Sequence, residues 1–436
     1  MLTPIIWKKL LKNERSQLLQ RPVQENNVDW IKQVQDILNR VRLEGDRACL
    51  QMTQQYDGVD LASCEVKKEE FVVAREKVSE DTRRAMIKVM KQLNAFHAPQ
   101  KIGDIKVETA TGIVCESVSR PIQRVGLYIP AGSAPLVSTV FMLGVPAMLA
   151  NCPLRILCSP PQKSGEIDPH ILVAAELCGI TQLYKLGGAQ AIAAMAYGTE
   201  TIPKVDKIFG PGNSWVTQAK ILVSQNAAGA IYDVPAGPSE VMIIADQYAN
   251  AEFIAADLLS QAEHGHDSQV FLVCTDMDLA KQVTVEMMRQ IKALSRRITI
   301  EHALKNSHLI WVDTLMEAID MANDYAPEHL IMHIVDPRRY IENIQNAGSV
   351  FLGPWSPESA DDYASGTNHV LPTGGYAKSL SGLSVRDFMK TISIQELTKQ
   401  GLNDIADTIN VLATLEGLDA HKNAVNIRLG EDIDAK

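Results

Sequence analysis

The chain has 436 residues and a formal net charge of −10, with 46% hydrophobic and 22% charged residues. This length permits a large core and favours two or more domains, and the composition is typical of a folded α/β protein rather than a disordered or fibrous one. Because the net charge is negative and no run of Lys or Arg occurs, a phosphate backbone would be repelled, and no nucleic-acid partner is expected.

The seven cysteines are scattered and form no Cys-x-x-Cys pair, a pattern typical of reduced thiols in the cytoplasm. Cys115 or Cys152 is a candidate nucleophile, but neither lies in a recognisable nucleophile motif, and a small buried side chain is the simpler interpretation. The first nine residues turn polar and lack the apolar stretch of a signal peptide, which favours a cytoplasmic location. Prolines and glycines interrupt the uncharged stretch 125–154, which is therefore expected in a buried core and not in a membrane.

After an N-terminal extension of residues 1–26, apolar spacing predicts helices over 28–50 and 82–96. From residue 125 the pattern changes to short apolar runs that alternate with helical segments. This alternation indicates βαβ units and a mostly parallel sheet. The predicted strands are 125–129, 155–158 and 205–209, and the predicted helices are 137–150, 169–178, 189–197 and 213–225.

A second series of the same kind follows, so the predicted fold class is α/β, with two Rossmann-like domains with parallel sheets plus small helical N- and C-terminal extensions. Its strands are predicted at 241–245, 270–274, 309–312, 330–334 and 350–352, with intervening helices that end at His264, Leu294, Asn323 and Gln345. Residues 355–383 are polar and too long for a mere connector, which is typical of a functional loop. Residues 394–415 are predicted to be helical.

The stretch 236–265 is the most informative part of the chain. It places a Gly-Pro turn, a strand and a helix in a row, and the helix ends with Gln261 and His264 on one face. An amide oxygen and an imidazole nitrogen suit a cation such as zinc if other segments supply the remaining ligands, although a solvated or hydrogen-bonded face is the alternative. Asp362 is a candidate carboxylate ligand, or else the cap of a turn.

Two glycine turns, at 186–190 and 209–213, open predicted helices. Helix N-terminal amides attract phosphates, so a nucleotide pyrophosphate is one occupant, but no Gly-x-Gly-x-x-Gly is present and ordinary tight turns remain the alternative. Glu328 and His329 lie side by side just before a predicted strand. Neighbouring side chains point in different directions along a strand, so the two can serve separate proton transfers around one substrate.

These segments together resemble the histidinol dehydrogenase family, NAD-dependent enzymes of the last two steps of histidine biosynthesis. The resemblance runs nearly end to end and is carried by the segments 125–130, 187–193, 205–213, 235–240, 260–264, 327–330, 355–359, 363–372 and 416–425. It implies oxidation of L-histidinol to L-histidine through histidinaldehyde, with two NAD.

The resemblance also implies the roles of individual residues. Zinc, one per subunit, would be held by Gln261, His264, Asp362 and His421. The substrate would contact these four residues and also Ser239, His329 and Glu416, while NAD would contact Tyr128, Gln190 and Asn213. His329 would take the alcohol proton and Glu328 would activate water. Asp361 is a competing ligand, but the alignment with Tyr363 and the following residues favours Asp362.

On this basis we expect a larger domain formed by 27–127 together with 239–383, which carries most of the metal and catalytic residues. An incomplete Rossmann-like NAD domain would span 128–238. The tail 384–436 would be exchanged in a homodimer, so that two subunits share each active site. A two-domain binding protein fits the α/β rhythm but gives no reason for the His, Gln and Asp set, and a zinc hydrolase would not need the nucleotide turns.

Overall fold

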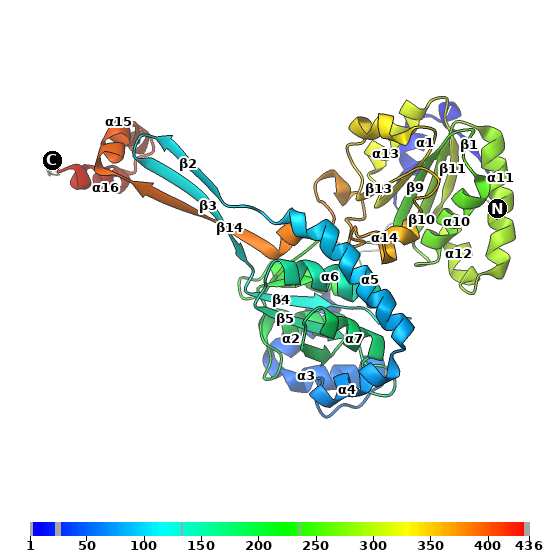
Figure 1. Ribbon diagram of the computed structural model, residues 1–436, viewed down its shortest axis with the longest axis horizontal. Coiled ribbons are helices and arrows are strands. Elements are labelled where there is room, and N and C mark those ends of the chain that lie inside the picture. Colours follow the sequence, from blue (N-terminus) through cyan, green and yellow to red (C-terminus); the bar gives the residue numbers. More distant parts are fainter. Residues whose placement is uncertain (1–2, 22–27, 132–133, 235–236, 431–436) are drawn as a thin grey trace. The chain divides into compact units, whose positions relative to one another are not determined.

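The computed structural model describes residues 3–21, 28–131, 134–234 and 237–430, in which it forms three β-sheets (Figure 1). Contacts divide the chain into two units. The first comprises residues 1–100 and 122–388 and holds both parallel sheets, and the second comprises residues 101–121 and 389–436. The predicted α/β class with two parallel sheets is thus confirmed.

The first parallel sheet has five strands in the order β6-β5-β4-β7-β8. Its first strand in the sequence, β4, lies in the middle, so the chain builds one half of the sheet and then crosses to the other, as in Rossmann-like folds. The strands are β4 (Arg124–Tyr128), β5 (Leu154–Ser159), β6 (Gln182–Lys185), β7 (Lys207–Phe209) and β8 (Ile231–Tyr232), connected by α6 (Val137–Leu149), α7 (Pro169–Leu177), α8 (Gly188–Tyr197) and α9 (Ser214–Ser224).

The N-terminal helices pack onto the helices of this first sheet. Helix α2 contacts α8 and α9, α4 contacts α7, and α5 contacts α6. These helices are α2 (Val28–Glu44), α3 (Asp46–Met52), α4 (Lys68–Lys77) and α5 (Glu80–His97). The helix predicted over 28–50 is divided at Gly45, whose φ of 57° an L side chain rarely adopts. The domain boundaries proposed from the sequence remain a prediction.

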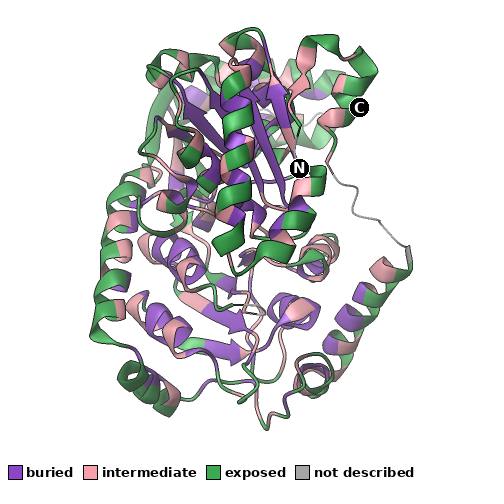
Figure 2. Ribbon diagram, turned by 90° about the vertical axis from the view of Figure 1, so that its right-hand side faces the viewer, coloured by how far each residue is buried: buried purple, intermediate pink, exposed green. Residues whose placement is uncertain are grey.

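The second parallel sheet has six strands in the order β1-β11-β10-β9-β12-β13. Figure 2 shows that its central strands are buried. Alternate residues of β9 face two cores, one formed with α10, α11 and α12, the other with α1 and α13. The elements are β1 (Ile5–Ile6), α1 (Lys12–Leu18), β9 (Glu240–Ala245), α10 (Ala251–Ala262), β10 (Gln269–Cys274), α11 (Met277–Gln290), α12 (Arg297–Ala303), β11 (His308–Trp311), α13 (Leu315–Tyr325), β12 (His329–His333) and β13 (Ser349–Leu352).

Two predicted helices are wrong in part. The helix expected before Gln345 is a 3₁₀ segment, Pro337–Asn343, preceded by Asp336 at a φ of 50°. The segment 394–415 was expected to be helical throughout, but it starts within strand β14 (Met389–Leu397), and helix α15 begins only at Lys399. The polar segment after Trp355 contains a short helix, α14 (Glu358–Tyr363).

Strand β14 belongs to the second unit, which was not predicted to contain a sheet. There β14 and β2 (Ile105–Ala110) both pair antiparallel with β3 (Ile113–Pro121). The unit also contains α15 (Lys399–Leu415) and α16 (Asp419–Leu429), which pack against each other.

Among the residues described, no helix combines the length and the apolar character needed to cross a membrane. The uncharged stretch after Arg124 instead contains β4 and α6, and much of both is buried.

Candidate active site

A cavity of about 950 Å³ lies where the strands of the first sheet end. Tyr128 is the last residue of β4, Gly188 begins α8, and Asn213 is the N-cap of α9. All three, with Gln190, line the cavity, which therefore faces the N-termini of two helices. Such a place is favourable for phosphate groups because backbone N–H groups there have no partner within the helix.

The walls of this cavity are held by hydrogen bonds within the turns. The Tyr128 hydroxyl accepts a hydrogen bond from the Gly188 N–H at 3.0 Å, and burial raises the pKa of this tyrosine to about 12, so it stays protonated. Asn213 Oδ1 accepts from the Val216 N–H at 3.1 Å. Gly210 adopts a φ of 120°, and a Cβ there would lie 2.2 Å from the Tyr128 carbonyl oxygen. The turn at 209–213 therefore requires glycine at this position.

The opposite wall of the cavity was not predicted from the sequence. It comes from α2, from the last residue of α3 and from the π-helix Thr53–Asp57 that follows. These residues are Gln33, Asp36, Ile37, Arg40, Met52, Gln55, Tyr56 and Asp57. Helical periodicity places the first four on one face of α2, but nothing in the sequence indicates that this face borders the glycine turns.

Glu328 and His329 lie at the amino end of the second sheet, and both are bound to the backbone of Glu240. The Glu240 N–H donates to Glu328 Oε2 at 2.9 Å, and the Glu240 carbonyl faces His329 Nδ1 at 3.2 Å. With Nδ1 as the donor in this contact, the buried Nε2 is an acceptor without a partner. Burial lowers the pKa of His329 to about 3 and raises that of Glu328 well above its usual range.

Three potential metal ligands converge beside this pair. One ligand atom each from His264, Glu358 and Asp362 lies within 4.8 Å of the others. Glu358 and Asp362 are four residues apart on α14 and so share a face of that helix, whereas His264 follows the C-terminus of α10. Glu358 was missed as a candidate ligand, although its i,i+4 spacing from Asp362 was a usable signal.

The side chain of Gln261, fully buried on α10, lies against Glu358. With its amide nitrogen on that side, Gln261 donates to Glu358 Oε2 at 2.7 Å, and its oxygen accepts from the Glu240 N–H at 3.3 Å. The nitrogen also lies 3.3 Å from His329 Nδ1, which in this orientation is an acceptor. With the oxygen on that side, two acceptors face each other, an arrangement that a bound cation stabilises. The amide can therefore act as a donor in the free cluster and as a ligand in a loaded one.

Buried carboxyl groups surround the cluster. Burial raises the pKa of Asp257 and of Asp362 to about 7, with a further contribution from Asp361 to the latter. Burial raises the pKa of Glu358 well above its usual range, and the charges of Asp362 and Glu328 add to the effect. Because the charged form of each acid is unfavourable without a positive partner, the site is suited to a cation.

The imidazole of His369 contacts the backbone of Asp362. Its Nδ1 lies 3.2 Å from the Asp362 carbonyl, and its Nε2 lies 3.3 Å from the Thr139 hydroxyl on α6. Asp361 instead accepts a hydrogen bond from the Thr367 hydroxyl. The convergent cluster in the described part of the chain thus contains Asp362 and not its neighbour.

The structure brings together Gln261, His264, Glu328, His329 and Asp362, each proposed from the sequence as a site residue. Ser239 directly precedes β9, and its carbonyl accepts from the Gln269 N–H at 3.1 Å. Glu416 and His421 belong to the second unit, where both are exposed.

The cysteines do not form part of this site. All seven are free, and burial raises the pKa of Cys152 to about 11, so its nucleophilic thiolate is disfavoured. Cys115 lies on β3 in the second unit.

Comparisons with known proteins agree with one another. The family model described as histidinol dehydrogenase matches residues 19–429. The histidinol dehydrogenase of Vibrio cholerae is 51% identical over 98% of both chains, and that of Colwellia psychrerythraea is 50% identical over the same shares. The crystal structure of histidinol dehydrogenase from Elizabethkingia anophelis superposes with a TM-score of 0.94 at 46% identity, covering 98% of each chain.

Proposed function

The chain belongs to the histidinol dehydrogenase family, and we propose that the acidic cluster at the amino end of its second sheet is the place of oxidation. The protein is an NAD-dependent oxidoreductase of histidine biosynthesis that converts L-histidinol to L-histidine through histidinaldehyde. Family membership over nearly the whole chain excludes the alternatives of a binding protein and a zinc hydrolase.

We propose that zinc binds to His264, Asp362 and Gln261, with His421 as the fourth ligand. The convergence of N and O ligands and the raised pKa values of the surrounding acids support this assignment. Glu358, which lies against both the amide of Gln261 and the other ligands, is a further candidate ligand. Zinc bound there would supply a Lewis-acidic anchor for the amino and imidazole nitrogens of histidinol.

In the alcohol step, His329 is the base. Its Nδ1 is fixed by the Glu240 carbonyl, so the free Nε2 can take the hydroxyl proton as the carbinol hydride leaves for NAD. Burial lowers the pKa of the ring, so it is neutral and its Nε2 lone pair is free, while the same burial disfavours the imidazolium that proton transfer forms. This unpartnered, buried Nε2 is the single observation that carries the assignment.

In the aldehyde step, Glu328 removes a proton from the water that adds to the carbonyl carbon. Burial raises the pKa of Glu328 and favours its neutral form, and zinc at the adjacent ligand cluster would favour the carboxylate that this role needs. The Glu240 N–H holds one of its oxygens in place. The hydrate anion so formed gives its hydroxyl proton to His329 as its hydride leaves for the second NAD, and the product is the carboxylate of histidine.

The cavity at the carboxyl end of the first sheet is our proposed site for NAD. Tyr128, Gln190 and Asn213 line it, and its two helix N-termini would face the pyrophosphate. The absorbance of NADH formed from histidinol and NAD, with and without a chelator, tests the whole assignment. Full activity in exhaustively demetallated protein would contradict the anchoring role of zinc.

The exchange of the C-terminal tail in a homodimer is also a proposal, drawn from the family resemblance. Glu416 and His421 are exposed on the second unit and so are available to a site elsewhere. Co-expression of Glu328→Gln and His421→Ala chains, each inactive alone, tests it. If tails are exchanged, roughly half the dimers are mixed and about a quarter of all sites regain activity, by the two-fold symmetry of the dimer. If each tail serves its own body, the mixed pool stays inactive.

A further inference from the structure

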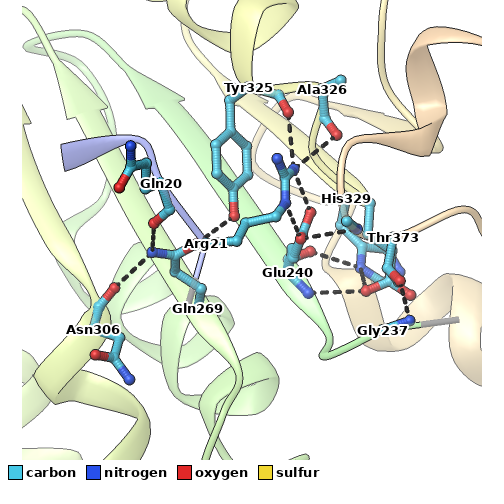
Figure 3. A network of polar contacts seen from close by, with 12 residues as sticks. Gln20, Arg21, Gly237, Glu240, Gln269, Asn306, Tyr325, Ala326, His329 and Thr373 are labelled. Atoms are coloured by element: carbon cyan, nitrogen blue, oxygen red, sulfur yellow. Dashed lines mark hydrogen bonds and ion pairs between the residues drawn. The ribbon is translucent and has the colours of Figure 1, made fainter. Parts of the chain in front are cut away.

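We propose that Arg21, in the N-terminal segment, is a positioning residue for Glu328 and His329, and that it acts through Glu240 (Figure 3). The inference rests on the roles proposed above for the catalytic pair. It concerns a residue that lies about 300 positions earlier in the sequence, outside every motif that the sequence analysis used.

Arg21 makes a two-pronged ion pair with Glu240. Its Nε donates to Glu240 Oε1 at 2.5 Å and its Nη2 to Oε2 at 2.9 Å, while Nη2 also donates to the Tyr325 carbonyl at 2.8 Å. The guanidinium carbon lies 4.0 Å from the centre of the Tyr325 ring. Because the Glu240 side chain is only 2% exposed, solvent does little to replace this partner.

The backbone of Glu240 holds both catalytic side chains. Its N–H donates to Glu328 Oε2, and its carbonyl faces His329 Nδ1. The same residue is fixed from a third side, because the Gly374 N–H donates to Glu240 Oε1 at 3.0 Å. A displacement of Glu240 therefore moves the acid and the imidazole together.

The segment that carries Arg21 is itself tied to the sheet. The Gln20 carbonyl accepts from Gln269 Nε2 at 3.3 Å, and Gln269 Oε1 accepts from the Tyr325 hydroxyl at 2.7 Å. Gln269 is also the register partner of Glu240 across β10 and β9. Figure 3 shows Arg21 beside the Tyr325 ring and bound to Glu240, with Gln269 linking the Gln20 backbone to the Tyr325 hydroxyl. These contacts fix the position of Arg21 beside Glu240.

Loss of Arg21 leaves a buried carboxylate without a cation, beside acids that already repel one another. The charge of Glu240 is one of the causes that raise the pKa of Glu328. Unpaired buried charge is strongly unfavourable, so Glu240 would be displaced from its present position. We expect the aldehyde step to suffer most, because the carboxylate that serves it is bound directly by the Glu240 N–H.

The test compares Arg21→Met with Lys8→Met, which removes an exposed ion pair to Asp313 from the same N-terminal segment. NADH yields in single turnovers with histidinol and with histidinaldehyde separate the two steps. In Arg21→Met the aldehyde step should slow by about 100-fold, with the KM for histidinol within about threefold of the wild type. Lys8→Met should stay within about twofold of the wild type in both steps.

A role in folding alone predicts a different result. Arg21→Met would then melt at a lower temperature but would keep the wild-type rate when assayed well below its melting point, and this outcome would overturn the proposal. The double variant Arg21→Met/Glu240→Gln gives a second readout, because it removes the unpaired charge and keeps the backbone contacts. It should be at least about tenfold faster than Arg21→Met in the aldehyde step. A double variant as slow as the single one contradicts the mechanism.

Glu328→Gln, assayed alongside, separates this inference from the proposed function. If Glu328→Gln keeps the aldehyde step, the roles of the catalytic pair are wrong. If Glu328→Gln loses that step and Arg21→Met does not, only the role of Arg21 is overturned.

Discussion

The two parallel sheets present opposite ends to their sites. The first sheet uses the carboxyl ends of its strands, where α8 and α9 begin, and Gly188 and Asn213 stand at the helix N-termini. The second sheet uses the amino ends, where β9 and β12 begin and α10 terminates just before His264. Because a helix N-terminus is partially positive and a C-terminus partially negative, the first site favours an anionic ligand and the second a cationic one.

The side chains reinforce this difference. The second site gathers buried acids with raised pKa values, including Glu328, Glu358 and Asp362. The lining of the first combines glycine turns and amide side chains with the charged residues Asp36, Arg40 and Asp57. On the assignments proposed above, one architecture would provide both a phosphate site and a metal site without a change of fold. A reaction between a dinucleotide and a metal-anchored amine requires both.

The largest effect is expected at the second site, which favours a cationic ligand. His329→Asn should slow both steps by about 1,000-fold, because one imidazole serves each proton removal, whereas Glu328→Gln should slow the aldehyde step much more than the alcohol step. Single-turnover NADH yields with histidinol and histidinaldehyde measure each step. His308→Asn is the control, since His308 begins β11 on the same end of the sheet. Equal damage to both steps by Glu328→Gln would remove its assignment.

The next largest effect concerns the metal. Asp362→Asn should weaken zinc binding by about 100-fold, because it removes a charged ligand from the cluster. Asp361→Asn should retain the metal, since Asp361 is bound to Thr367 instead. Metal content after dialysis against a zinc buffer provides the measurement. If Asp361→Asn lost more zinc than Asp362→Asn, Asp361 and not Asp362 would be the ligand.

A smaller effect is expected at the first site, the cavity that favours an anionic ligand. Gly210→Ala should raise the KM for NAD by about tenfold, because its Cβ would meet the Tyr128 carbonyl and shift the turn. Gly353→Ala has a comparable positive φ of 81° but open space around it, so it reports backbone strain alone. Initial rates at varied NAD distinguish the two. An unchanged KM in Gly210→Ala would argue against the cavity as the NAD site.

The smallest effect separates capping from binding. Asn213→Ala and Asn250→Ala each remove an N-cap, from α9 and α10, and each should lower the free energy of unfolding by about 1 kcal/mol. Only the former should also raise the KM for NAD. Denaturant unfolding and NAD titration of both variants provide the comparison, and equal KM values would assign Asn213 to the helix alone.

The repeated βαβ pattern was predictable because buried parallel strands are nearly continuous apolar runs. Strands such as β9 and β10 were found to within a residue or two. The antiparallel sheet of the second unit was not predicted, although Ile105 and Val107 alternate with Lys106 and Glu108 as they do in a strand. Every residue of Ile105–Ala110 is exposed, so this strand forms without a buried face. Strand β14 was missed in the same way, because Ile392 and Ile394 alternate with polar residues but are both exposed.

The site was predictable only where the ligands lie close together in the sequence. Gln261 and His264, and Glu328 and His329, were identifiable as pairs. The contact of Glu240 with both catalytic residues depends on the register of β9 and β12, in which His329 pairs with Val241. This register cannot be predicted from a single sequence. The link to Arg21 requires the whole sheet to be in place.

Strand β1 is synthesised long before the strand with which it pairs, so it can join the sheet only late in folding. Ile5 and Ile6 leave the ribosome about 300 residues ahead of β11, the strand with which they pair. Until β11 has been synthesised, the two-residue strand β1 has no partner strand, and its apolar side chains stay exposed to solvent. Since β1 occupies an edge, it can dock last without disturbing the strands already assembled. A bulky fusion ahead of residue 3 would thus be expected to slow the final docking step more than the folding of the first sheet.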